Sequence, residues 1–212
     1  MSPEELRRSL FDRMFAGNLV ENRWRGDLVE EIVNQAIDRS RWRHCSGDWN
    51  SWDFEQLDGP LKVQVKQAAL RQTWTKEENA QRVETLATVR FGIRKAKGYY
   101  VGNQWRQLPT PARIAEIYLF AFHPGESSSA NHWDAKAWRF YGLREQDLPD
   151  QASLSLCDMK KKAERCGFAD VGVCCLNSAL SALAAKTAPN GRIEQSVTAN
   201  PDDGDAEAPG EA

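Results

Sequence analysis

Alternating apolar and polar residues over positions 61–66 predict a β-strand. Leucine and valine occupy the odd positions, whereas Gln64 and Lys66 fall on the opposite face and therefore project together. A second short strand is expected at 52–55, and the turn residues Asp58-Gly59-Pro60 separate the two strands. The pattern therefore predicts a β-hairpin with a polar face.

Two N-terminal segments have a helical pattern instead. Ser2-Pro3-Glu4-Glu5 has the form of a capping box with proline at the first helical position, which predicts a helix running to about Met14. A second helix is expected at 28–37, after a turn at Gly26, because its apolar residues fall on one side of a helical wheel. Glu30 lies on the flank of this apolar side, at the boundary between core and solvent.

The remaining pattern predicts a mixed α/β protein of one domain, residues 1–186, since 212 residues are too few for two full domains. From Thr187 the chain is rich in Pro, Gly, Asp, Ala and Asn and poor in apolar residues, so residues 187–212 are expected to form a disordered acidic tail. Further elements are expected as helices at 74–88 and 153–165, strands at 89–94, 98–101, 116–122 and 137–143, and a short strand followed by a helix within 171–185.

The charge distribution points to a polyanionic partner. The whole chain carries a net charge of −2, but five acids and no basic residue follow Glu194, so residues 1–194 hold 28 basic and 25 acidic residues, a net charge of +3. Residues 61–113 contain eleven Lys or Arg and three acids, a local charge of +8. Such a segment suits a polyanion, although a solvated basic surface has the same composition.

Composition also bears on the cellular compartment in which we expect the protein. With 41% hydrophobic and 27% charged residues and short apolar runs, no membrane span is expected. The acidic N-terminus lacks the pattern of an export signal, so we expect a cytoplasmic protein. The five cysteines are an odd number without CxxC spacing, and they are expected to be reduced thiols rather than disulfides or a zinc site.

The hairpin brings together residue types that suit phosphodiester hydrolysis with a divalent cation. Asp53 offers a carboxylate oxygen, Gln64 an amide oxygen and Val65 its carbonyl, which are the hard ligands that Mg²⁺ or Mn²⁺ prefers. Lys66 would orient the attacking water or stabilise the transition state. Glu30 would hold a ligating water or complete a second metal position. The alternative is that Gln64 and Lys66 line a solvated strand face while Asp53 caps a turn.

The order of a helical Glu30, strand Asp53 and strand Gln64-Val65-Lys66 resembles the PD-(D/E)xK, or restriction-endonuclease-like, superfamily in its Gln-x-Lys variant. Several stretches resemble a group of uncharacterised bacterial proteins with this nuclease core: 22–30, 52–55, 63–69, 71–74, 115–120 and 138–141. The resemblance covers roughly residues 18–165 and implies an αβββαβ core with a mixed central sheet flanked by helices, the site at the opening of the sheet, and DNA as substrate. The usual second acid is Gln64 here, which removes one negative charge from the ligand shell and should weaken Mg²⁺ binding.

Residues next to the lysine are candidates for contacting DNA. Gln67 and Gln72 could contact phosphate or a base edge, although ordinary surface amides are an alternative. Arg71 belongs to the same basic segment, and Trp74 is placed to stack against a base.

The sequence therefore predicts a Mg²⁺- or Mn²⁺-dependent DNA endonuclease in bacterial defence or DNA processing. A homodimer or partner proteins of a defence complex are open as further partners. A different class remains open as well: a nucleic-acid-binding subunit that keeps the nuclease fold with weak or no catalysis. In a third interpretation, the acidic tail of a protein-interaction factor shields the basic surface from DNA.

Overall fold

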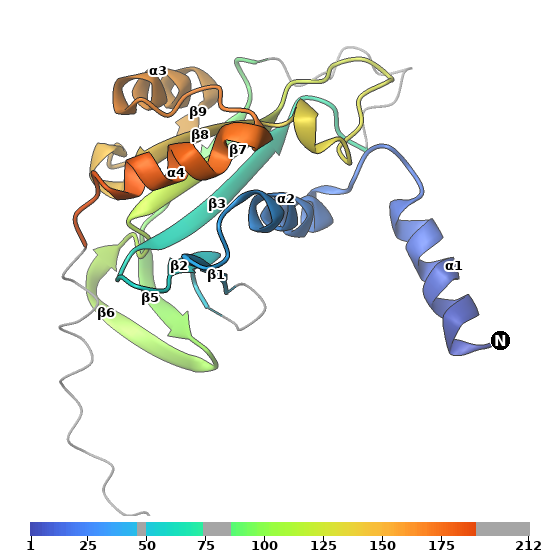
Figure 1. The fold of residues 1–212 in the computed structure, drawn as a ribbon, viewed down its shortest axis with the longest axis horizontal. Helices are drawn as coiled ribbons and strands as arrows, with labels where there is room; N and C mark the ends of the chain where they lie inside the picture. The colour runs from blue at the N-terminus through green and yellow to red at the C-terminus, as the bar shows by residue number, and fades with distance from the viewer. Residues whose placement is uncertain (46–49, 74–85, 190–212) are drawn as a thin grey trace, which may run out of the picture.

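A five-stranded mixed sheet forms the centre of the protein in a computed structural model, which describes residues 1–45, 50–73 and 86–189 (Figure 1). The strand order is β1-β2-β3-β7-β8. Strand β3 pairs antiparallel with β2 and parallel with β7, and β7 pairs antiparallel with β8. The five strands are β1 (Trp42–His44), β2 (Phe54–Gln56), β3 (Lys62–Ala69), β7 (Ile117–His123) and β8 (Arg139–Arg144).

Two small antiparallel pairs lie beside the central sheet. Strand β4 (Arg90–Gly92) pairs with β9 (Ser153–Ser155), and β5 (Ala96–Val101) pairs with β6 (Gln104–Ala112). The β5–β6 hairpin packs its Tyr99 against Trp52. This contact places the hairpin beside the chain that enters β2.

Helices cover both faces of the central sheet. Helix α2 (Asn22–Ala36) and helix α4 (Leu176–Ala184) share one apolar core with the Val63 and Val65 face of β3. Helix α3 (Leu156–Cys166) packs on the opposite face, over the aromatic residues of β7 and β8. Helix α1 (Pro3–Phe15) has no buried residue and extends away from the sheet (Figure 1).

The predicted hairpin is confirmed, because β2 and β3 are antiparallel neighbours and the apolar side chains of β3 face the core. Its first strand is Phe54–Gln56 rather than 52–55, so Asp53 directly precedes the strand. The N-terminal helix and its capping box are also confirmed, with the Ser2 side chain accepting from the Glu5 N–H. The turn expected at Gly26 is wrong, since α2 begins at Asn22 and runs through this glycine. The helix expected from residue 153 begins at Leu156, because Ser153–Ser155 pairs with β4 and Ser155 caps the helix.

The mixed α/β class and the mixed sheet with flanking helices are therefore confirmed. The helix expected at 74–88 and the acidic tail lie mostly outside the described residues. Within the described part of the chain, no helix is long and apolar enough to cross a membrane.

Candidate functional site

The candidate site lies where β2 separates from β3. Phe54 is opposite Val63 in this short pairing, and the preceding residue, Asp53, still donates its backbone N–H to the Val63 carbonyl at 2.9 Å. Beyond this point the Asp53 side chain takes the place of a neighbouring strand. Its Oδ2 accepts the Val65 N–H at 2.5 Å and the Gln64 Nε2 at 2.6 Å. The carboxylate therefore occupies the open edge of β3.

Burial of this carboxylate shifts its protonation. Asp53 is only 8% exposed, and burial together with the negative charge of Glu30 raises its pKa to about 6. The N–H of Val65, the charge of Lys66 and the Gln64 amide act in the opposite direction. Asp53 is consequently ionised at neutral pH but takes up a proton in mildly acidic solution.

Lys66 lies close to Asp53 as well, because it is two residues after Gln64 and therefore on the same face of β3. Burial lowers the pKa of its ammonium group, while the charges of Asp53 and Glu30 raise it. The charges at this edge are thus close enough to shift the pKa values of Asp53 and Lys66. Such mutual perturbation is typical of functional sites, although structural ion pairs also produce it.

Glu30 comes from α2 and has a partner that the sequence did not predict. Its Oε2 lies 3.3 Å from Nε2 of His44, the last residue of β1. The His44 ring stacks on Phe54, with a centroid distance of 4.9 Å. The contact between Glu30 and His44 connects the helix to the sheet, and the charge of Glu30 is close enough to act on Asp53.

Oxygen atoms of the kind that a hard divalent cation prefers lie at this edge. The carbonyls of Val63 and Val65 point to the same side of β3, because they are two residues apart in a strand, and the Val63 carbonyl already faces β2. The Gln64 amide donates to Asp53, so it must turn over before its oxygen can act as a ligand beside that carboxylate. Among residues 1–45, 50–73 and 86–189, no group of three or more His, Cys, Asp or Glu is placed to hold a metal.

A pocket of about 270 Å³ opens on the outward face of β3, and Gln64, Lys66, Arg94 and Tyr118 are among its lining residues. Arg94 is exposed. The pocket therefore offers an anionic group the basic side chains of Lys66 and Arg94, and Lys66 is also close enough to Asp53 to affect its pKa.

The two amides expected to contact DNA, those of Gln67 and Gln72, take part in a hydrogen-bond network around the buried Arg25. Arg25, 2% exposed on α2, donates to Gln67 Oε1 at 2.6 Å, to Gln72 Oε1 at 2.7 Å and to Asn22 Oδ1 at 2.8 Å. Gln72 is buried and also donates to the Ala69 carbonyl at 2.7 Å. Both ends of the Gln72 amide are therefore engaged in hydrogen bonds within the protein.

The other expected DNA contacts have different environments. Gln67 is partly exposed, and its Nε2 donates to Asn22 Oδ1 at 3.1 Å. Arg71 is partly exposed as well, and its NH1 lies 3.5 Å from the Glu126 carbonyl. Trp74 lies outside the described residues.

The structure thus brings Glu30, Asp53, Gln64 and Lys66 together, with the Val65 backbone at the same edge. Two residues that the sequence did not predict are also involved: His44, which contacts Glu30, and Arg25, which bonds to Gln67 on β3. The sequence signal for His44 was weak, because a three-residue strand has no measurable alternation. Arg25 could have been recognised as a buried residue from its position, because it lies one turn before Val29 on the apolar side of α2.

Comparison with known proteins does not show a family for this protein. No protein-family model matches the sequence, and neither the curated proteins nor the solved structures contain a significant match.

Proposed function

We propose that the protein is a divalent-metal-dependent DNA endonuclease of the PD-(D/E)xK type. One observation carries the proposal: the buried Asp53 carboxylate bonds to Gln64 and to the Val65 N–H at the open edge of β3, next to Lys66. A solvated strand face would expose these side chains instead. Asp53 is buried and Lys66 is partly buried with a perturbed pKa, so the arrangement favours a site.

The order of elements supports the same proposal. Helix α2 is followed by the three antiparallel strands β1 to β3. Strands β4, β5 and β6 come next and lie outside the central sheet, and the chain then returns to it as β7, which is parallel to β3. The αβββαβ core implied by the resemblance requires this order and a mixed sheet. Its second helix would fall in the segment 74–88, most of which lies outside the described residues.

Asp53, the Val65 carbonyl and, after rotation, the Gln64 amide oxygen would hold Mg²⁺ or Mn²⁺. When bound, such a cation polarises a phosphoryl oxygen and lowers the pKa of a water molecule. Lys66 lines the adjacent pocket, where its ammonium group would bind the scissile phosphate and stabilise the charge that develops there. Glu30, held by His44, would accept a hydrogen bond from water at this edge.

The test measures cleavage and binding of plasmid and short linear DNA by the wild type and by Lys66→Ala, with Mg²⁺, Mn²⁺ or EDTA. Lys66→Ala should bind DNA but cleave it about 10²- to 10³-fold more slowly, the usual cost of removing a charge that stabilises a transition state. Lys62→Ala is a matched control, because Lys62 is on the same strand face but lies over the Trp52 ring, 4.9 Å from its centroid. Cleavage by Lys66→Ala at the rate of Lys62→Ala would remove Lys66 from the proposal.

The second candidate is a nucleic-acid-binding subunit without catalysis. It is favoured by the small number of acids, because only Asp53 and Glu30 supply carboxylates among the described residues of the site. A calorimetric titration with Mn²⁺ separates the two functions. Saturable binding that Asp53→Ala abolishes supports the nuclease, whereas DNA binding without metal binding or cleavage supports the subunit.

A further inference from the structure

Two adjacent thiols lie in the short turn that leads into α4, next to α2. Cys174 and Cys175 are both exposed, and their sulfur atoms are 3.6 Å apart. They end a short 3-10 turn, Val173–Cys175, which follows Gly172 and leads directly into α4. Side chains of adjacent residues in a helical turn normally point in different directions, so this proximity is unusual.

We propose that Cys174 and Cys175 are a reversible redox modification site, which closes to a vicinal disulfide when the protein meets a peroxide. This inference does not depend on the proposed nuclease activity. The other three cysteines are separated from this pair along the chain, and Cys45 is buried while Cys157 is exposed on α3.

The order of the chemical steps follows from the contact between the thiols. The hydrogen bond and charge of Cys174 raise the pKa of the Cys175 thiol, so deprotonation of Cys175 is disfavoured and the first attack is assigned to Cys174. The Cys174 thiolate attacks one peroxide oxygen, the O–O bond breaks, and the sulfur is oxidised to a sulfenic acid while hydroxide leaves. Cys175 then attacks that sulfur, the S–O bond breaks and water leaves. In total, two thiols and one hydrogen peroxide become one disulfide and two water molecules.

The expected disulfide is easily reduced. Adjacent α-carbons are about 3.8 Å apart across a trans peptide bond, which is shorter than the usual range of about 4.4–6.8 Å in disulfides. Ring closure therefore strains the turn, and strained, exposed disulfides have higher reduction potentials than structural ones. A cellular dithiol should restore the reduced pair, as a reversible site requires.

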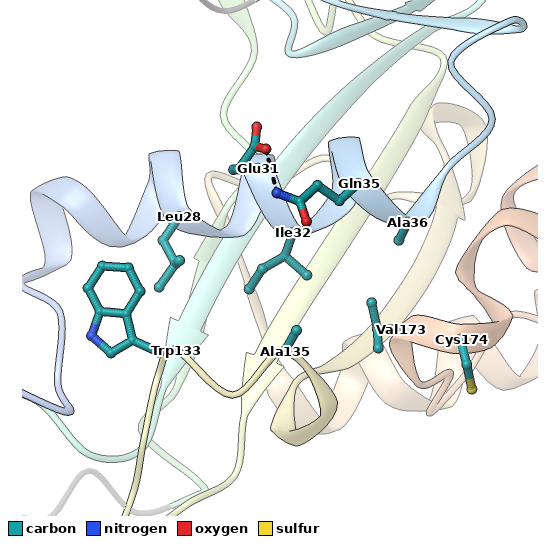
Figure 2. Close-up of a pocket in the computed structure, with 9 residues that line it drawn as sticks. All are labelled: Leu28, Glu31, Ile32, Gln35, Ala36, Trp133, Ala135, Val173 and Cys174. Atoms are coloured by element: carbon teal, nitrogen blue, oxygen red, sulfur yellow. Dashed lines mark hydrogen bonds between the residues drawn. The ribbon is translucent and has the colours of Figure 1, made fainter.

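The turn also lies against the helix that carries Glu30. Val173 and Cys174 line a pocket of about 540 Å³ together with Leu28 and Ile32 of α2, and in Figure 2 the Val173 side chain points toward Ala36. The Cys175 N–H donates to the Gly172 carbonyl at 3.0 Å within the turn. Closing the ring must alter this turn, and α2 is its immediate neighbour.

The experiment treats the full chain with hydrogen peroxide, blocks the remaining thiols with N-ethylmaleimide and maps the modified peptides by mass spectrometry. The wild type should lose alkylation at both positions and contain a Cys174–Cys175 peptide lighter by two hydrogen atoms, and dithiothreitol should reverse both changes. Cys174→Ser and Cys175→Ser should not form this product, while Cys157→Ser should behave as the wild type does.

A second measurement tests proximity without oxidation. Phenylarsine oxide binds tightly when one arsenic atom bridges two thiols, so it should protect both cysteines of the reduced wild type from N-ethylmaleimide, but neither single variant. Oxidation of Cys174 that leaves Cys175 alkylated, or disulfides that join two molecules, would overturn the proposal. Failure of the arsenical to protect the pair would overturn it as well.

Discussion

The buried Asp53 carboxylate should reduce the stability of the protein at neutral and alkaline pH. Its ordinary pKa of 3.8 is raised to about 6 in the folded state, so folding favours the protonated form. Because the folded-state pKa is the higher one, the stability that this group contributes is present below pH 3.8 and is lost as the pH rises through 6. Asp53→Asn keeps a side-chain oxygen for the Val65 N–H but removes the charge.

The size of this effect follows from the difference between the two pKa values. At about 1.4 kcal/mol per pH unit, it corresponds to at most about 3 kcal/mol. The attraction of Lys66 is already included, because Lys66 is among the groups that set this pKa. We expect Asp53→Asn to raise the free energy of unfolding by about 1–3 kcal/mol at pH 8, while abolishing any metal-dependent cleavage.

Urea denaturation of the wild type and Asp53→Asn between pH 4 and pH 8 measures this difference. The gain should shrink steadily as the pH falls below about 6, because the wild-type carboxyl then becomes neutral too. Asp53→Ala serves as a comparison, since it also removes the bonds to Gln64 and Val65. A variant that is less stable than the wild type at pH 8, or a difference that does not change with pH, would refute the reasoning.

Three further outcomes are expected. Arg25→Ala should lower the free energy of unfolding by about 3–5 kcal/mol, because the Gln67 and Gln72 amides lose their donor. Denaturant titrations measure this loss. Arg23 is exposed, so Arg23→Ala should lower the free energy of unfolding by less than about 0.5 kcal/mol. Deleting residues 1–13 should reduce the helical circular dichroism signal but leave the unfolding midpoint of the remaining protein unchanged, because α1 has no buried residue. Any metal-dependent cleavage should decline below pH 6 as Asp53 takes up a proton, which a pH–rate profile would reveal.

The sequence was informative where a local pattern determines the structure. Strict alternation over 61–66 and the turn at 58–60 predicted the β2–β3 hairpin, and with it the placement of Gln64 and Lys66 on one face. Asp53 is eleven residues before Gln64, so the hairpin alone brings the two side chains together. For Glu30 to join this site, its helix needed only to pack near the same edge of the sheet.

Elements that depend on distant partners were missed or displaced. Strand β1 is three residues long and shows no alternation, and it forms because β2 is available as a neighbour. Strand β6 contains Pro109 and Pro111, which argue against a strand, yet it pairs with β5 at the edge of a two-stranded sheet. The Arg25 network joins α2 to the end of β3 over more than forty residues, a pairing that no local pattern indicates.

The parallel pairing of β3 with β7 has a consequence for how the protein folds. Val63 pairs with Ile117, 54 residues later, so this pairing requires closure of a long loop, whereas the β2–β3 turn is short. Hairpins form in about 1–10 μs, and contacts between distant segments form more slowly. We therefore expect the segment with Asp53, Gln64 and Lys66 to take shape early, before β7 completes the sheet. Substitutions in the hairpin should then slow folding, and substitutions in β7 should mainly speed unfolding.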